Sequence, residues 1–152
     1  FSQEMLEKHF DFYEPFTVHE SSLSPCVHSI QAAKLDRMDQ AYQFYLRTSR
    51  LDLDDYNKEV EEGLHITSMA GTWMSIVEGF GGLRIIDDKL SFNPRIPNKW
   101  KTYSFKINFR NRIIKVTVSA SGTKFKLDGH EQMSIRYKGK RLELNPGEEI
   151  SA

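Results

Sequence analysis

Two stretches of the sequence concentrate small polar side chains at the predicted starts of helices. Residues 19–25 read His-Glu-Ser-Ser-Leu-Ser-Pro, and residues 63–73 read Gly-Leu-His-Ile-Thr-Ser-Met-Ala-Gly-Thr-Trp. A helix N-terminus presents unpaired backbone N–H groups and a positive partial charge, so it favours anions. Hydroxyl groups add hydrogen-bond donors that suit phosphate oxygens. The chemistry that these residue types can supply is therefore anion binding with little fixed charge.

The second stretch predicts a helix with a polar face and an apolar face. His65, Ser68, Thr72 and Ser75 recur at intervals of three or four residues, which places them on one side of a helix. We expect this side to lie opposite an apolar stripe that packs into the core. The stripe comprises Ile66, Met69, Ala70, Trp73 and Val77. A histidine at the start of the polar face can donate to an anion without a permanent charge.

Structural roles for the same residues stay open at this point. Ser24 precedes a proline and is typical of a helix cap, while Ser21 and Ser22 also suit a loop. His65 can serve a purely structural role, and Cys26 has no obvious base beside it, which indicates a buried thiol. The sequence shows no metal-ligand spacing, no glycine-rich phosphate loop with a lysine and no nucleophile elbow.

The residues before position 83 predict helices, and those after it predict strands. Helical periodicity appears before Pro15, after Ser24, over 38–46 and over 66–77. From Tyr103 the apolar period changes to two, as expected for half-buried strands. The predicted strands cover 103–109, 113–118, 124–127, 133–137 and 141–144, with hairpin turns at Arg110-Asn111 and Lys138-Gly139. We therefore expect domains at 1–83 and 84–152.

The formal net charge of zero conceals two oppositely charged segments. Residues 1–83 contain 14 acidic and 6 basic side chains, and residues 84–152 contain 7 acidic and 15 basic ones. Zero overall charge argues against bulk attraction to nucleic acid or to a membrane surface. The basic residues alternate with apolar ones and are not interleaved with aromatic residues, so they indicate a solvated sheet face.

Several features bear on the location and completeness of the chain. A single cysteine excludes an intramolecular disulfide and favours a reducing compartment, so we expect a cytoplasmic protein. No apolar run reaches the roughly 20 residues that a membrane span requires. The chain begins with Phe1 instead of Met, and we interpret it as a piece of a longer protein.

Five strings together resemble signatures of the inverting disaccharide phosphorylases of glycoside hydrolase family sixty-five. They are FYEP at 12–15, VHESSLSP at 18–25, LDLDDYN at 51–57, GLHITSMAGTW at 63–73 and GFGGLR at 79–84. The resemblance covers the whole chain and implies its architecture. Residues 1–83 are similar to the last helices of an (α/α)6 barrel, and residues 84–152 to a small C-terminal antiparallel β-sheet or sandwich domain.

The resemblance also implies a reaction and a division of labour. Inorganic phosphate attacks the anomeric carbon of an α-linked glucosyl disaccharide with inversion, and a protonated carboxyl group acts as the general acid. By position, Ser21, Ser22 and His65 match the phosphate-binding residues, and Ser68 and Gly71 are further candidates. The general-acid glutamate has no counterpart in this chain. No cofactor or metal is expected, because phosphate is itself a substrate.

Three functional hypotheses follow. We favour the C-terminal part of a disaccharide phosphorylase of the maltose type, with trehalose or kojibiose as alternative substrates, acting on disaccharide and phosphate together with the rest of its own barrel. The second hypothesis is an α,α-trehalase-type hydrolase of the same family. The third is a non-catalytic carbohydrate-associated module carried by the β segment. A homodimer is expected from the resemblance alone, and neither nucleic acid nor a membrane is an expected partner.

Overall fold

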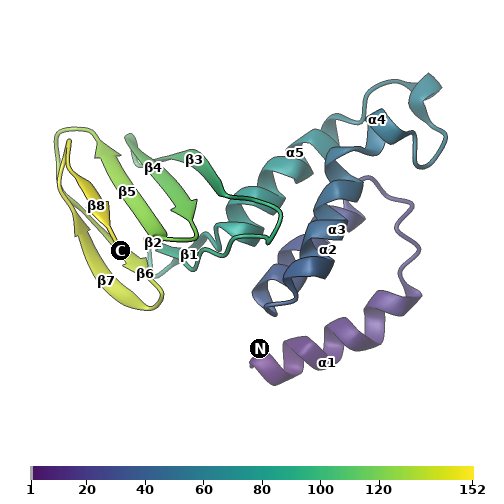
Figure 1. Cartoon of the computed structure of the whole chain (residues 1–152), viewed down its shortest axis with the longest axis horizontal. Helices are drawn as coiled ribbons and strands as arrows, with labels where there is room; N and C mark the ends of the chain where they lie inside the picture. The colour runs from purple at the N-terminus through teal and green to yellow at the C-terminus, as the bar shows by residue number, and fades with distance from the viewer. Residues whose placement is uncertain (1) are drawn as a thin grey trace. The chain divides into compact units, whose positions relative to one another are not determined.

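The computed structural model describes residues 2–152, and its contacts divide the chain into two compact units. One unit ends at Phe80 and is helical, and the other spans Gly81–Ala152 and is built of strands (Figure 1). This order confirms the predicted fold class of helices followed by a small sheet domain. Within the described residues, no helix has the length and apolar character needed to cross a membrane.

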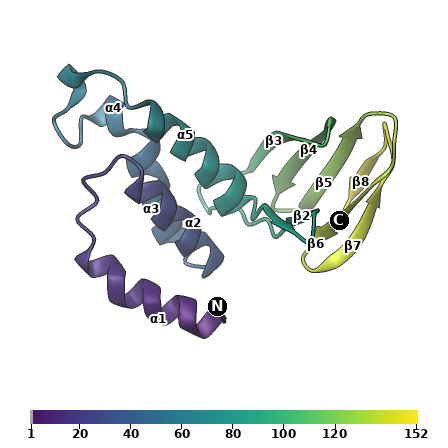
Figure 2. The same cartoon turned by 180° about the vertical axis from the view of Figure 1, so that it is seen from behind.

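The described residues of the helical unit form five α-helices and three helical turns of other types. The α-helices are α1 (Gln3–Tyr13), α2 (Ser24–Lys34), α3 (Met38–Ser49), α4 (Leu51–Asp54) and α5 (Ile66–Met74). The turns are η1 (Glu14–Phe16), η2 (Val60–Glu62) and the wider π-helical turn η3 (Ser75–Phe80). Helices α2 and α3 lie side by side in both views (Figures 1 and 2).

The helix ends follow local sequence signals with an exception at α2. Ser2 accepts a hydrogen bond from the Met5 N–H and caps α1, as its position predicts. Ser24 was expected to cap α2, and this expectation is wrong. Leu23 occupies the N-cap position, and the Ser24 hydroxyl instead pairs with the ring of His19 at 2.8 Å. The Ser24 hydroxyl is thus engaged by a ring five residues earlier in the chain.

Helix α5 buries its small polar face, contrary to the sequence expectation. Ser68 and Ser75 are buried, whereas Ile66 and Trp73 of the expected core stripe are 74% and 51% exposed. The Ser75 hydroxyl donates to the Gly71 carbonyl within the helix, so its burial leaves no polar group unpaired. Small side chains on this face allow α5 to approach α2 closely.

The second unit is a sandwich of two four-stranded sheets. Its strands are β1 (Arg84–Ile86), β2 (Lys89–Phe92), β3 (Thr102–Phe109), β4 (Arg112–Ser119), β5 (Gly122–Asp128), β6 (Met133–Tyr137), β7 (Lys140–Leu144) and β8 (Glu149–Ser151). The sheet orders are β1-β2-β6-β7 and β3-β4-β5-β8. The pairing of β2 with β6 is parallel, and the other pairings between the named strands are antiparallel.

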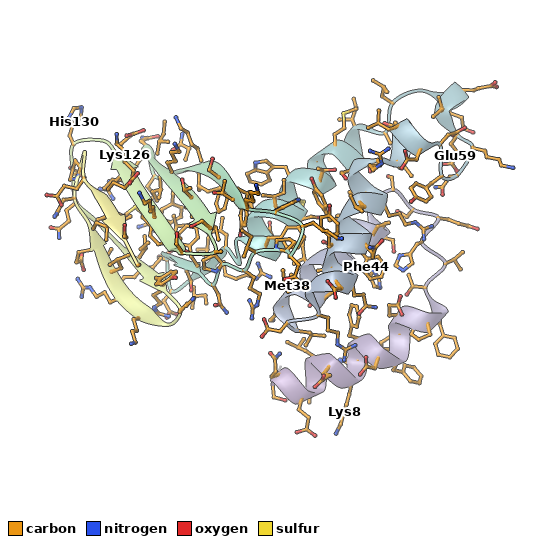
Figure 3. All side chains as sticks on the ribbon, in the orientation of Figure 1. Lys8, Met38, Phe44, Glu59, Lys126 and His130 are labelled. Atoms are coloured by element: carbon orange, nitrogen blue, oxygen red, sulfur yellow. The ribbon has the colours of Figure 1, made fainter. Side chains whose placement is uncertain are left out.

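Aromatic side chains join the two sheets of the sandwich. The rings of Phe92 in β2 and Phe125 in β5 lie 5.4 Å apart, and both are fully buried. On the outer face, Lys115 stands opposite Lys106 and Lys126 in register, and all three lysines are exposed. These exposed lysines agree with the predicted solvated basic face, and Lys126 is labelled in Figure 3.

The contact between α5 and α2 generates a stability prediction. A Cβ atom on Gly71 would lie 2.9 Å from the Cβ of Cys26, whereas one on Gly79 would meet the Ile30 backbone at an ordinary 3.5 Å. We expect Gly71→Ala to lower the free energy of unfolding by about 1–3 kcal/mol. The control Gly79→Ala should change it by less than about 1 kcal/mol. Denaturant unfolding followed by circular dichroism measures both, and equal effects would contradict the packing argument.

Candidate functional site

The two polar stretches identified in the sequence meet through their hydroxyl groups. The Ser22 Oγ lies 2.8 Å from the Thr67 Oγ1, although the two residues are 45 positions apart. Ser22 stands in the loop before α2, and Thr67 stands in the first turn of α5. The Ser21 Oγ accepts a hydrogen bond from the Leu23 N–H at 3.3 Å. The start of α5 and the serine loop therefore form one polar surface.

Three hydrogen bonds hold the serine loop in place. Arg47 of α3 donates to the His19 carbonyl at 3.0 Å, and Asn57 donates to the Glu20 carbonyl at 3.3 Å. The His19 ring itself pairs with Ser24 at the other end of the loop. His19 adopts a left-handed backbone conformation with φ of 58°, which turns the chain before the serines. Loop position is thus fixed by contacts from three elements.

The ring of His19 is buried against other aromatic rings. Its centroid lies 4.5 Å from that of His28 and 5.0 Å from that of Phe44 on α3, which is labelled in Figure 3. Burial is the main cause that lowers the pKa of His19 to about 4, and the nearby His28 and Arg47 lower it further. The ring is therefore neutral at neutral pH, and it acts as a packed anchor for the serine loop.

His65 is held at the start of α5 by a carboxylate of α4. The Asp52 Oδ1 lies 2.6 Å from the His65 Nδ1, and the Asp52 Oδ2 accepts the His65 backbone N–H at 3.1 Å. The hydrogen bond to Asp52 is the main cause that raises the pKa of His65, and the charges of Asp52, Glu59 and Glu62 raise it further. The same hydrogen bond lowers the pKa of Asp52.

A second carboxylate faces the other ring nitrogen of His65. The Glu59 Oε2 lies 3.5 Å from the His65 Nε2, and the Glu59 side chain is 39% exposed. Glu59 lies on the loop between α4 and η2, as Figure 3 shows. The His65 side chain is 21% exposed, and each of its ring nitrogens faces a carboxylate.

Ser68 and Gly71 occupy a different environment from the other candidates. The Ser68 hydroxyl is buried and donates to the Thr48 carbonyl at 2.7 Å, and Gly71 packs against Cys26. These contacts explain why position 68 is a serine and position 71 a glycine, because both residues allow α5 to pack against neighbouring helices. A direct phosphate role for Ser68 and Gly71 stays a prediction, while Ser21, Ser22 and His65 remain on the accessible polar surface.

The structure adds residues that the sequence reasoning did not single out. Thr67, Asp52, His19, Arg47 and Asn57 position the candidates, and all except Arg47 lie inside or beside the strings quoted above. The sequence could have indicated Asp52 and Thr67, because both residues lie within the quoted strings. No group of three or more His, Cys, Asp or Glu side chains among residues 2–152 is arranged to hold a metal ion.

Two domain models of one family match nearly all of the chain. The glycosyl hydrolase family 65 central catalytic domain matches residues 1–74, and the glycosyl hydrolase family 65 C-terminal domain matches residues 83–144. The chain belongs to glycosyl hydrolase family 65. The family resemblance inferred from the five strings is thereby confirmed.

Known relatives agree with this family membership. Maltose phosphorylase of Bacillus subtilis is 51% identical over 98% of this chain and 18% of that protein. Alpha,alpha-trehalose phosphorylase of Thermoanaerobacter brockii is 43% identical over 97% of this chain and 19% of that protein. A solved structure described as a kojibiose phosphorylase from the human microbiome matches all of this chain and 22% of its own, with 43% identity and a TM-score of 0.92. The chain thus spans about a fifth of the length of these relatives.

The buried His19 of this family 65 chain generates a pH prediction. Its pKa falls from the ordinary 6.5 to about 4 on folding, so the fold favours the neutral ring. This contribution to stability is present above pH 6.5 and is lost as the pH falls toward 4. We expect the variant His19→Asn to lose part of the acid-dependent decrease in melting temperature, because asparagine tolerates the left-handed conformation but does not titrate.

The exposed His9 of α1 supplies the matched control for this experiment. The variant His9→Asn should keep the melting-temperature profile of the parent between pH 7 and pH 4. Differential scanning fluorimetry across this range measures all three proteins. Parallel profiles for the parent and His19→Asn would show that His19 does not contribute.

Proposed function

We propose that the protein containing this chain is an inverting disaccharide phosphorylase with maltose as its substrate, and that this chain supplies the phosphate-binding part of its active site. The reaction converts maltose and inorganic phosphate to β-glucose 1-phosphate and glucose. Support for the reaction type comes from relatives that are named maltose, trehalose and kojibiose phosphorylases. The higher identity of the maltose phosphorylase, 51% against 43% for the trehalose phosphorylase, favours maltose.

The contact between Ser22 and Thr67 is the observation that carries the assignment of the site. It unites the serine loop with the first turn of α5, where His65 is held. The serine hydroxyls can donate to phosphate oxygens, and the N-terminus of α5 adds a favourable dipole. A protonated His65 can add a charge-assisted hydrogen bond through its Nε2. Ser21, Ser22 and His65 are therefore the proposed phosphate ligands.

Such a donor set suits a phosphate that must act as a nucleophile. Hydrogen bonds from neutral hydroxyls orient the anion at the anomeric carbon, while one oxygen stays available for attack. A cluster of fixed cations would hold the ground state more strongly and so would gain less in the transition state. Protonation of the leaving sugar requires a general acid outside this chain, as the family resemblance implies.

The helical unit exposes apolar side chains that a complete catalytic domain can cover. Phe16, Leu53 and Ile66 are 76%, 77% and 74% exposed, and Val18 is 70% exposed. Exposed apolar side chains gathered on one unit of this size mark an interaction surface. We propose that the rest of the protein's own barrel packs on them. A homodimer and a cytoplasmic location stay predictions, the latter favoured by the single cysteine.

The decisive test of the reaction is its dependence on phosphate. The full-length enzyme is incubated with maltose, trehalose or kojibiose, with and without inorganic phosphate, and the products are separated by chromatography. We expect β-glucose 1-phosphate only when phosphate is present, with maltose turned over fastest. Glucose release that is independent of phosphate would show a hydrolase. An inactive full-length protein whose isolated β unit binds sugar would show a non-catalytic module.

Removal of His65 tests the proposed phosphate ligand. In the full-length enzyme, His65→Ala should raise the phosphate KM and lower kcat/KM for phosphate by about 100-fold, because a charge-assisted hydrogen bond is lost. Initial rates at varied phosphate measure both quantities. The exposed His9→Ala serves as the control and should match the parent enzyme. An unchanged phosphate KM in His65→Ala would remove this residue from the site.

Thr67 tests the connection between the two polar stretches. Thr67→Val removes the hydroxyl that pairs with Ser22 but keeps the shape of the side chain. We expect the phosphate KM to rise about fivefold to tenfold, since a lost hydrogen bond to a positioned group costs about 1 kcal/mol. Thr67→Ser retains the hydroxyl and should restore the parent value. Equal phosphate KM values for the two variants would contradict the connection.

A further inference from the structure

Both carboxylate oxygens of Asp52 are engaged by a single residue. Oδ1 pairs with the His65 ring at Nδ1, and Oδ2 accepts the backbone N–H of the same histidine. Asp52 is 16% exposed and His65 is 21% exposed, so solvent screens this pair less than it screens a surface pair. A backbone anchor and a ring anchor on one carboxylate fix both the position and the rotation of the imidazole.

The orientation of a histidine decides which nitrogen can meet a ligand. An imidazole that donates Nδ1–H to a carboxylate presents only Nε2 to its other side, and the carboxylate stabilises a positive ring. The same arrangement orients histidines that bind metals, where loss of the outer carboxylate weakens binding or activity by about 10- to 100-fold. The same reasoning applies to a histidine that donates a hydrogen bond to an anion.

We propose that Asp52 is a positioning residue for phosphate: it holds His65 with Nδ1–H directed at its own carboxylate and Nε2–H directed at the phosphate oxygens. The proposal rests on the phosphate role of His65 given above and extends it to a residue that does not itself touch substrate. Asp52 is an anion beside an anion site, and its charge is tolerated there because His65 stands between it and the phosphate.

The charged groups around His65 predict how anion binding depends on pH. Asp52 faces the ring from α4, Glu59 and Glu62 face it from the η2 region, and all three raise the pKa of His65. Anion binding should therefore persist below the raised pKa and weaken as the pH rises through it. Glu59 lies at Nε2, so phosphate and Glu59 compete for the same hydrogen. The more exposed Glu59 side chain can turn away from the ring, while Asp52 is held by two hydrogen bonds to His65.

The test compares two aspartates of α4 in the full-length enzyme. Asp52→Asn removes the charge beside His65, whereas Asp54→Asn removes a charge that pairs with Arg50 at 2.6 Å. We expect Asp52→Asn to raise the phosphate KM about tenfold or more and to leave the disaccharide KM within about twofold. Asp54→Asn should match the parent in both values. Melting temperatures verify that each variant is folded.

A pH profile separates positioning from a merely structural role. Sulfate remains a dianion across the assay range, so its inhibition constant against phosphate reports on enzyme groups alone. In the parent, sulfate inhibition should weaken as the pH rises through the pKa of His65. In Asp52→Asn, the weakening should begin at lower pH, because the carboxylate that stabilises the charged ring is gone. If Asp52→Asn does not fold, Asp52→Glu, which keeps a displaced carboxylate, should give a shift of the same sign.

The outcomes distinguish this proposal from the function on which it rests. An unchanged phosphate KM and an unchanged sulfate profile in Asp52→Asn, beside a large effect of His65→Ala, would overturn the role of Asp52 and leave the phosphate site standing. No effect of His65→Ala on the phosphate KM would overturn the phosphate site itself. A parallel rise of the phosphate and disaccharide KM values in Asp52→Asn, with a lower melting temperature, would assign Asp52 a structural role only.

Discussion

The close contact between Gly71 of α5 and Cys26 of α2 sets the distance at which these two helices pack. Because Gly71 has no Cβ, α5 packs directly on the Cys26 side chain, and the first turn of α5 lies near the loop that precedes α2. Ser22 and Thr67 can then share a hydrogen bond although the chain makes a long excursion between them. The placement of Ser21, Ser22 and His65 depends on this packing, so a glycine at a contact between two helices influences the geometry of the polar surface.

Around this contact, the site is built in two layers with different electrostatic character. The inner layer consists of neutral groups and of one pair whose charges oppose each other. They are the buried ring of His19, the Ser68 hydroxyl and the Asp52–His65 pair. The outer layer consists of the hydroxyls of the serine loop and of Thr67, beside the His65 side chain, which is 21% exposed. This arrangement would allow a strongly acidic segment to bind the proposed phosphate. Local hydrogen-bond donors act over a few ångströms, while the distant carboxylates are screened by solvent.

The sequence predicted much of the fold because its signals are local. Ser2 and Pro15 mark the bounds of α1, and the alternation after Tyr103 predicts the long strands and the turn at Arg110-Asn111, where both residues have positive φ. The strands β1, β2 and β8 were not predicted. Each has only three or four residues, which is too short for a periodic pattern to appear.

The site itself was less predictable, since burial depends on which neighbours a helix has. The apolar stripe of α5 suggested a core face, but the helix packs by its smallest residues and leaves Ile66 and Trp73 exposed in this chain. The sequence motifs alone could indicate Ser21, Ser22 and His65. They could not indicate that Asp52 of another helix would bind His65. That pairing is a tertiary contact across 13 residues, and no periodicity encodes it.

The Cys26 thiol offers a chemical reporter for the helical unit. It is 1% exposed beneath Gly71, and burial raises its pKa, so a thiol reagent can reach it only when α2 and α5 separate. No other cysteine exists in the 152 residues to confuse the signal. The rate of alkylation under native conditions therefore measures the local opening equilibrium of the helix pair that carries the polar surface. Ligands that bridge the two helix starts would slow this reaction in proportion to the population they hold closed.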